Sequence, residues 1–308
     1  MRWTGRGRHQ SKYVKDVSSE DCMVWAALFV LCLVLFNQIL RAAQRFEVDL
    51  LPAVAVNYGV AAILSGVLWW THSEQALSRS SLLAITLGGV NGALYFAHLL
   101  IIGASYRVAG VGITAALVGT GSVLPVVVSW ALWGEAMPPA RWLAIILLIP
   151  AVALLRPGNG EGHGRLSLGA DVILALACLM AGVIATVHKT VQVYGSGEGN
   201  AVYQFALFAT AAACSGGYAL LKRSRWAARA VGAGTALGTA NCLATLCLLA
   251  ALATVPATVL FPVTTPSNIA ANTVVARLLW RERLSRRQLA GMALALIVVI
   301  LASVKVAC

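Results

Sequence analysis

The chain has 308 residues, of which 59% are hydrophobic and only 11% are charged. Soluble domains carry about 25% charged residues, so this composition excludes an ordinary soluble protein and places most of the chain in a membrane. The formal net charge of +12 does not indicate nucleic-acid binding, because the Lys and Arg residues lie in short runs between apolar segments. Anionic lipid headgroups are the expected partner of these runs.

Apolar segments of membrane-crossing length repeat along the whole chain, and each needs about 20 residues to span. A polar, basic tail (1–21) precedes a first half (22–155), and a Gly-rich linker (156–167) separates it from a second half (168–308). The predicted fold is therefore all-α and integral to the membrane, with about ten transmembrane helices, five in each half. The expected spans are 22–40, 50–71, 81–102, 109–133, 137–155, 168–190, 201–221, 230–253, 258–280 and 289–306.

Three sequence matches between the halves predict an internal repeat. Trp133-Gly134-Glu135 closes the fourth span, and Trp280-Arg281-Glu282 closes the ninth span 147 residues later. Leu87–Asn91 matches Leu237–Asn241 at an offset of 150, and Asn57 matches Gln204 at 147. Because each half has an odd number of spans, the second half must be inserted upside down, and inverted repeats are a transporter architecture.

The ninth span carries a polar stripe that an ordinary lipid-facing helix would not tolerate. Thr265, Asn268 and Asn272 follow one another at steps of three and four, which places them on one helix face. Pro262 and Pro266 precede or interrupt this stripe, and Pro125 lies in the fourth span; we expect all three to bend or break their helices. A polar face at membrane depth is expected to line a pathway or a cavity.

The third and eighth spans carry similar faces. Asn91, Tyr95 and His98 share one face of the third span, and Asn241 and Thr245 share one face of the eighth. These side chains either line a cavity or bond neighbouring helices together. His98 either takes part in proton coupling or solute contact, or is a neutral histidine within the core.

Charged residues near the span ends are expected to be structural. His188 and Lys189 in the sixth span, like Arg41 in the first, are expected to extend to the membrane interface, the alternative being an anion-attracting mouth. Glu135 and Glu282 are expected to pin helix ends. Acidic residues occur only in loops or at span ends, which disfavours export of lipophilic cations. No phosphate-cradling, zinc-binding or serine-hydrolase motif is present, so we expect no cofactor, no metal and no enzymatic activity.

The segment LLWRERLSRRQLAGMALALIVVILAS, together with Trp133-Gly134-Glu135, resembles the EamA-type branch of the drug/metabolite transporter superfamily. The resemblance covers residues 22–306 and implies ten helices in two inverted five-helix halves around a central cavity. It also implies a multi-pass protein of the cell (inner) membrane with both termini in the cytoplasm. Lys and Arg residues outside the tail are more numerous on the opposite side, which favours the reverse orientation.

The sequence thus predicts a secondary transporter of a small polar metabolite, amino-acid-like and neutral or zwitterionic. The alternatives are an antiporter of phosphorylated or nucleotide-linked anions and, in another class, a membrane enzyme or a non-transporting scaffold. The candidate solute-binding residues are Asn91, Tyr95, His98, Asn241, Thr245, Thr265, Asn268 and Asn272, with Asn57 and Gln204 behind them.

Overall fold

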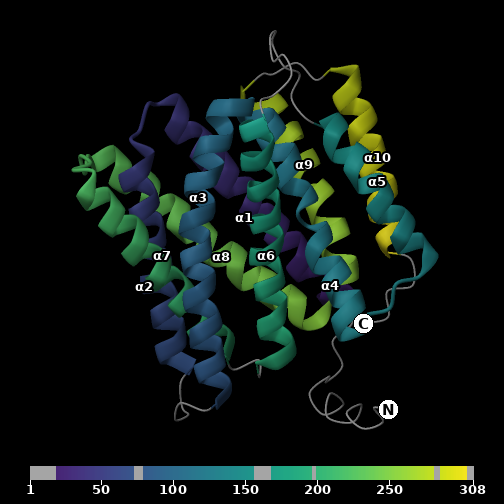
Figure 1. Cartoon of the computed structure of the whole chain (residues 1–308), viewed down its shortest axis with the longest axis horizontal. Helices are drawn as coiled ribbons and strands as arrows, with labels where there is room; N and C mark the ends of the chain where they lie inside the picture. The colour runs from purple at the N-terminus through teal and green to yellow at the C-terminus, as the bar shows by residue number, and fades with distance from the viewer. Residues whose placement is uncertain (1–18, 73–78, 156–167, 196–198, 281–284, 304–308) are drawn as a thin grey trace.

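The computed structural model describes residues 19–72, 79–155, 168–195, 199–280 and 285–303, and all regular structure in these ranges is helical (Figure 1). The predicted tail up to residue 18, the linker 156–167 and Glu282 lie outside the described residues. The helices are α1 (Ser19–Arg45), α2 (Leu50–His72), α3 (Arg79–Thr120), α4 (Val123–Trp133), α5 (Pro139–Leu155), α6 (Leu168–Tyr194), α7 (Gly199–Leu221), α8 (Ala228–Thr254), α9 (Ala257–Trp280) and α10 (Arg286–Ser303).

Six of these helices, α1, α2, α3, α6, α7 and α8, contain stretches long and apolar enough to cross a membrane. The chain is therefore a multi-pass membrane protein, as its composition predicts. Shorter apolar helical stretches occur at Val118–Trp133, Pro139–Leu154 and Leu289–Ala302. In α9 the Thr, Asn and Pro residues interrupt the apolar sequence and lower its hydropathy.

Two helix breaks that the sequence suggests are absent. The expected connection between 102 and 109 is absent, because α3 continues without a proline for 42 residues. Its end comes at Gly121 and Ser122, whose backbone N–H groups bond to the carbonyls of Val118 and Gly119 in tight turns. In α9 the helix runs on through Pro262 and Pro266, which are both buried.

Helices from the two sequence halves pack against each other throughout the bundle. α2 packs on α7 and α8, α3 on α6 and α7, and α1 on α8 and α9; α4 contacts α6 and α9. Figure 1 shows the α5–α10 pair at one edge of the bundle and the α2–α7 pair at the other. The interior between the edges is thus formed by helices of both halves.

Two pairs of glycines let these helices approach closely. A Cβ added at Gly88 of α3 would lie 2.5 Å from the Tyr203 carbonyl oxygen of α7, and one at Gly92 would collide with the Leu207 carbonyl oxygen. In α8, a Cβ at Gly234 or Gly238 would lie 2.5 Å from a carbonyl oxygen of α2. Small residues four apart at a helix crossing allow backbone contact inside a membrane, and here they bring the polar faces of α3 and α8 against α7 and α2.

Candidate functional site

A chain of hydrogen-bonded side chains crosses the interior between α3, α6, α7 and α8. The Asn91 amide donates to the Tyr203 hydroxyl at 2.7 Å, and this hydroxyl lies 2.9 Å from His188 Nδ1. His188 Nε2 lies 3.0 Å from the Tyr95 hydroxyl, which has Thr245 as a further hydrogen-bonding partner. Asn91, Tyr203 and His188 are almost fully buried. We call these five residues the interior polar chain.

One assignment of protons, with His188 neutral, satisfies every bond of this chain. Because the Asn91 nitrogen can only donate, the Tyr203 oxygen accepts there and its own proton is directed to His188 Nδ1. Neutral His188 then carries its proton on Nε2 and donates to Tyr95. Asn91 Oδ1 has no hydrogen-bond donor within the described part of the chain. The polar chain therefore presents a buried acceptor, whose unmet hydrogen bond carries a cost of about 1–3 kcal/mol.

A second polar contact joins α2, α7 and α8. The Asn241 amide donates to Asn57 Oδ1 at 3.3 Å, while Gln204 donates to the carbonyl oxygen of Cys242 at 2.9 Å. Asn57 and Gln204 are buried, and Asn241 keeps part of its surface exposed. These amides bond neighbouring helices together in the structure, as the alternative interpretation of the sequence proposes for Asn91 and Asn241.

The stripe on α9 meets α1. Gln38 donates to Asn272 Oδ1 at 2.8 Å, and Asn272 in turn donates to Asn268 Oδ1 at 2.9 Å. Thr265 lies one turn before Asn268, with its methyl group facing Gly119 of α3. Thr265, Asn268 and Asn272 are all partly exposed.

His98 lies apart from the other candidates. Its Nε2 is 3.1 Å from the carbonyl oxygen of Ala177 on α6, and its ring is partly buried. The histidine that joins the interior polar chain is instead His188, which the sequence assigns to the membrane interface.

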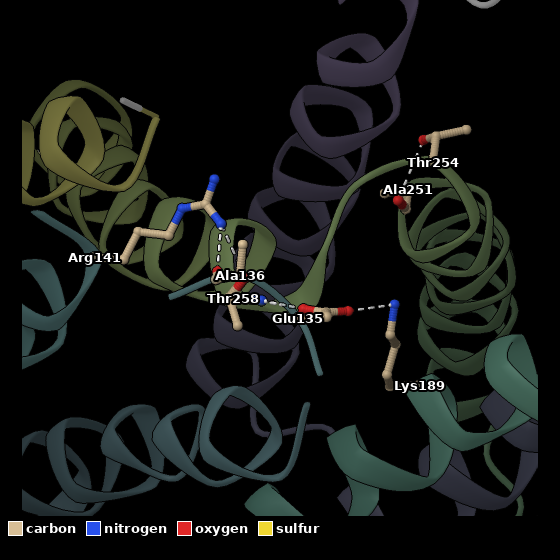
Figure 2. Close-up of polar contacts among 7 residues, drawn as sticks. All are labelled: Glu135, Ala136, Arg141, Lys189, Ala251, Thr254 and Thr258. Carbon is tan, nitrogen blue, oxygen red and sulfur yellow. Dashed lines mark hydrogen bonds and ion pairs between the residues drawn. The ribbon is translucent and has the colours of Figure 1, made fainter. Parts of the chain in front are cut away.

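That interfacial assignment is wrong for both His188 and Lys189. Lys189 is only 9% exposed, and its ammonium group lies 2.8 Å from Glu135 Oε1 (Figure 2). Each side chain turns inward because it has a bonding partner there, which a terminal position in an apolar segment does not reveal. Glu135 does pin a helix end, since its Oε2 accepts the backbone N–H of Thr258 at the start of α9, at 2.9 Å.

Tyr203 and Arg141 are further residues that the sequence patterns do not single out. Tyr203 immediately precedes Gln204, and only the α3–α7 crossing shows that its hydroxyl reaches Asn91. Arg141 is buried in the first turn of α5 and donates to the Ala136 carbonyl oxygen and to the Thr258 hydroxyl, at 2.8 and 3.3 Å. No group of three or more His, Cys, Asp or Glu side chains within the described ranges is placed to hold a metal ion.

Comparison with known proteins gives information on the fold alone. No family model matches the chain. No curated protein matches it either. A solved structure, described as "Crystal structure of protein", is similar with a TM-score of 0.74 over 93% of this chain and 97% of its own, at 14% sequence identity. The helical arrangement is thus shared with an experimentally determined protein.

Proposed function

We propose that the protein is a secondary transporter that carries a small polar solute across a membrane by alternating access. The observation that carries this proposal is the interior polar chain, which joins Asn91 and Tyr95 of the first half to His188, Tyr203 and Thr245 of the second. Its hydroxyl, amide and imidazole groups both donate and accept hydrogen bonds, and polar groups at this depth in a membrane are a mark of solute pathways.

The packing of the helices supports an inverted five-helix repeat of the EamA type. Exchanging α1–α5 with α6–α10 converts the α1–α8 contact into α6–α3, the α2–α8 contact into α7–α3 and the α1–α9 contact into α6–α4, all of which are present. The contacts of α5 with α3 and α9, of α9 with α10 and of α6 with α8 depart from this exchange. The Gly88 and Gly92 crossing with α7 has the same four-residue spacing as the Gly234 and Gly238 crossing with α2.

The charges near the interior favour a neutral or zwitterionic solute such as an amino acid. Lys189, which follows His188 of the interior polar chain, carries a buried ammonium group, and the Glu135 carboxylate neutralises its charge. A phosphorylated or nucleotide-linked solute would need positive charge that is not already paired. The neutral donors and acceptors of the polar chain suit hydroxyl, amide, ammonium and carboxylate groups instead.

The test is uptake of pooled radiolabelled amino acids into proteoliposomes of cell-membrane lipids, with and without a pH gradient. Tyr95→Phe removes one hydroxyl from the interior polar chain and should lower uptake at least tenfold. Tyr194→Phe removes a hydroxyl from an exposed tyrosine at the end of α6 and should leave uptake unchanged. Equal uptake by the two variants would separate the polar chain from solute binding, and no uptake by the folded parent protein would reject amino acids as the solute.

A further inference from the structure

Glu135 is placed where the first half of the protein holds two helices of the second. It lies in the short connection between α4 and α5, and both of its carboxylate oxygens are engaged (Figure 2). Oε1 pairs with Lys189 of α6 at 2.8 Å, and Oε2 accepts the N–H of Thr258 of α9 at 2.9 Å. One carboxylate therefore fixes the end of α6 and the start of α9 to the α4–α5 connection.

Arg141 strengthens the same junction. From the first turn of α5 it donates both to the Ala136 carbonyl oxygen, next to Glu135, and to the Thr258 hydroxyl. Thr258 is fully buried, and its hydroxyl also donates to the Ala136 carbonyl oxygen at 3.4 Å. The start of α9 is thus held through both its backbone and its side chain. Figure 2 shows Lys189 and Arg141 approaching this point from opposite sides.

Burial along α9 changes from this end to the other. From Ala257 to Thr264 every residue of the helix is buried, whereas beyond Thr265 most residues are partly exposed. The apolar cluster around the buried end includes Ala26 of α1, Val126 of α4, Leu252 of α8 and Val298 of α10. We refer to this end of the bundle, where α4 and α6 end and α9 begins, as the Glu135 end. It is closed by side chains, while the polar stripe of α9 begins where the closure stops.

Glu135 differs from the other acidic residues whose side chains the structure describes. Glu47, Asp49 and Asp171 are exposed, and the Asp49 carboxylate accepts the backbone N–H of Leu51 at the start of α2. Removing one partner of a buried ion pair leaves the other charge buried and unpaired, which is strongly destabilising. Asp49 offers a matched control, because it caps a helix without joining the two halves.

We propose that Glu135, with Lys189 and Thr258, forms a lock that holds the Glu135 end of the bundle closed and must separate before the interior polar chain opens to that side. This inference rests on the proposed transport function. In the open state, α6 and α9 move away from the α4–α5 connection, and the carboxylate and the ammonium group are hydrated separately. Glu135 acts here as a positioning residue and need not touch the solute.

The experiment measures access to the interior and needs no known solute. Thr245→Cys introduces a thiol on α8 nine residues before its end, which is about 14 Å from the Glu135 end. A membrane-impermeant maleimide is applied to either side of oriented proteoliposomes, and labelling at position 245 is quantified by peptide mass spectrometry. In this background, Glu135→Gln and Lys189→Gln should each raise the labelling rate from the Glu135 end at least tenfold and lower it from the opposite side.

Three further variants distinguish a lock from a general loss of packing. Lys189→Arg keeps the charge pair and should keep the parent labelling rate within about threefold, as should Asp49→Asn. The charge exchange Glu135→Lys with Lys189→Glu restores attraction without the bond to Thr258, and should recover part of the closure. Unchanged labelling in Glu135→Gln overturns the proposal, and so does an equal rise from both sides, which indicates loosened packing.

Amino-acid uptake by the same variants separates this proposal from the transport function. If maleimide labelling depends on the charge pair but the protein takes up no amino acid, the lock is supported and the proposed solute is rejected. If the protein takes up amino acids but maleimide labelling does not depend on the charge pair, the lock is rejected and the transport function stands.

Discussion

Replacing Gly88 with alanine tests the closest helix approach that supports the interior polar chain. A Cβ at this position would lie 2.5 Å from the Tyr203 carbonyl oxygen and 2.8 Å from the Ala206 Cβ, whereas ordinary contact begins at 3.4 Å. Because the nearest atom belongs to the backbone of α7, no side-chain rotation relieves the contact. The two helices must separate by most of an ångström, which weakens the packing on either side of the crossing.

The expected loss of stability follows from two opposing effects. Overpacking a close interface costs about 1–3 kcal/mol, and a rigid backbone contact belongs at the upper end of that range. Alanine in place of glycine within a helix returns about 1 kcal/mol through its higher helix propensity. The net destabilisation for Gly88→Ala is therefore about 2 kcal/mol. Gly59→Ala on α2 meets no atom within 4 Å, so the propensity gain alone should stabilise that variant by about 1 kcal/mol.

Thermal unfolding in detergent micelles measures both effects, with exposure of the buried Cys242 and Cys247 thiols as the signal. At about 2 °C per kcal/mol for a chain of this size, the apparent Tm should fall by about 4 °C in Gly88→Ala and rise by about 2 °C in Gly59→Ala. The apparent Tm of Gly234→Ala should fall by a similar amount, since the added Cβ would lie 2.5 Å from the Ala53 carbonyl oxygen. A Gly88→Ala protein as stable as the Gly59→Ala protein would refute the close approach.

Three other predictions concern individual contacts. Glu135→Gln and Lys189→Gln should each lower the free energy of unfolding by about 3 kcal/mol, because each leaves a buried charge unpaired. The double variant should lose about 2 kcal/mol less than the sum of the two single losses. Additive losses in thermal unfolding would show that the ion pair contributes nothing. Asn272→Leu should lower the free energy of unfolding by about 0.6 kcal/mol through the lost bond to Gln38. Thr273→Val should cause no loss, because within the described residues the Thr273 hydroxyl bonds only to Ile269 of its own helix. Equal unfolding midpoints for the two variants would contradict this. In folded protein, maleimide should modify the partly exposed Cys214 well before the buried Cys242, and mass spectrometry that finds equal labelling would place Cys242 nearer the surface than its packing indicates.

Helix positions follow from the sequence more closely than side-chain partners do. Runs of apolar residues bounded by polar ones place α2, α7 and α9 within two residues of their observed ends. The same pattern misplaces the end of α3, because apolar composition continues past residue 102 and only the turns at Gly121 and Ser122 stop the helix. Apolar periodicity thus predicts that a helix exists but not where it stops between two apolar neighbours.

Partners distant in sequence account for most of the candidate site that the sequence did not predict. Glu135 meets Lys189 and Thr258, and Asn91 meets Tyr203. None of these pairs lies within one helix, so helical spacing carries no information about them. The spacing does group Thr265, Asn268 and Asn272 correctly on one face, since that relation depends on a single helix.

The glycine crossings give a different register for the proposed repeat. Matching Leu87–Asn91 with Leu237–Asn241 aligns Gly88 with Gly238. The contacts instead align Gly88 with Gly234 and Gly92 with Gly238. Gly88 meets Tyr203 and Gly92 meets Leu207, four residues later in α7. In the same way, Gly234 meets Ala53 and Gly238 meets Asn57, four residues later in α2. Backbone contact is a stricter criterion than residue identity, because only the crossing geometry decides which glycine is needed.

The two ends of the bundle are held by interactions of different strength, and this difference bears on how a solute could drive the cycle. At the Glu135 end the halves share an ion pair with a coupling of about 2 kcal/mol, whereas towards the other end α1 and α9 share the Gln38–Asn272 bond, for which about 0.6 kcal/mol is expected. In the proposed transport cycle, a difference of about 1.4 kcal/mol between these two contacts would favour closure at the Glu135 end about tenfold. A solute shifts such an equilibrium only by its difference in affinity between the two states. A solute that binds both states equally would therefore leave that preference unchanged.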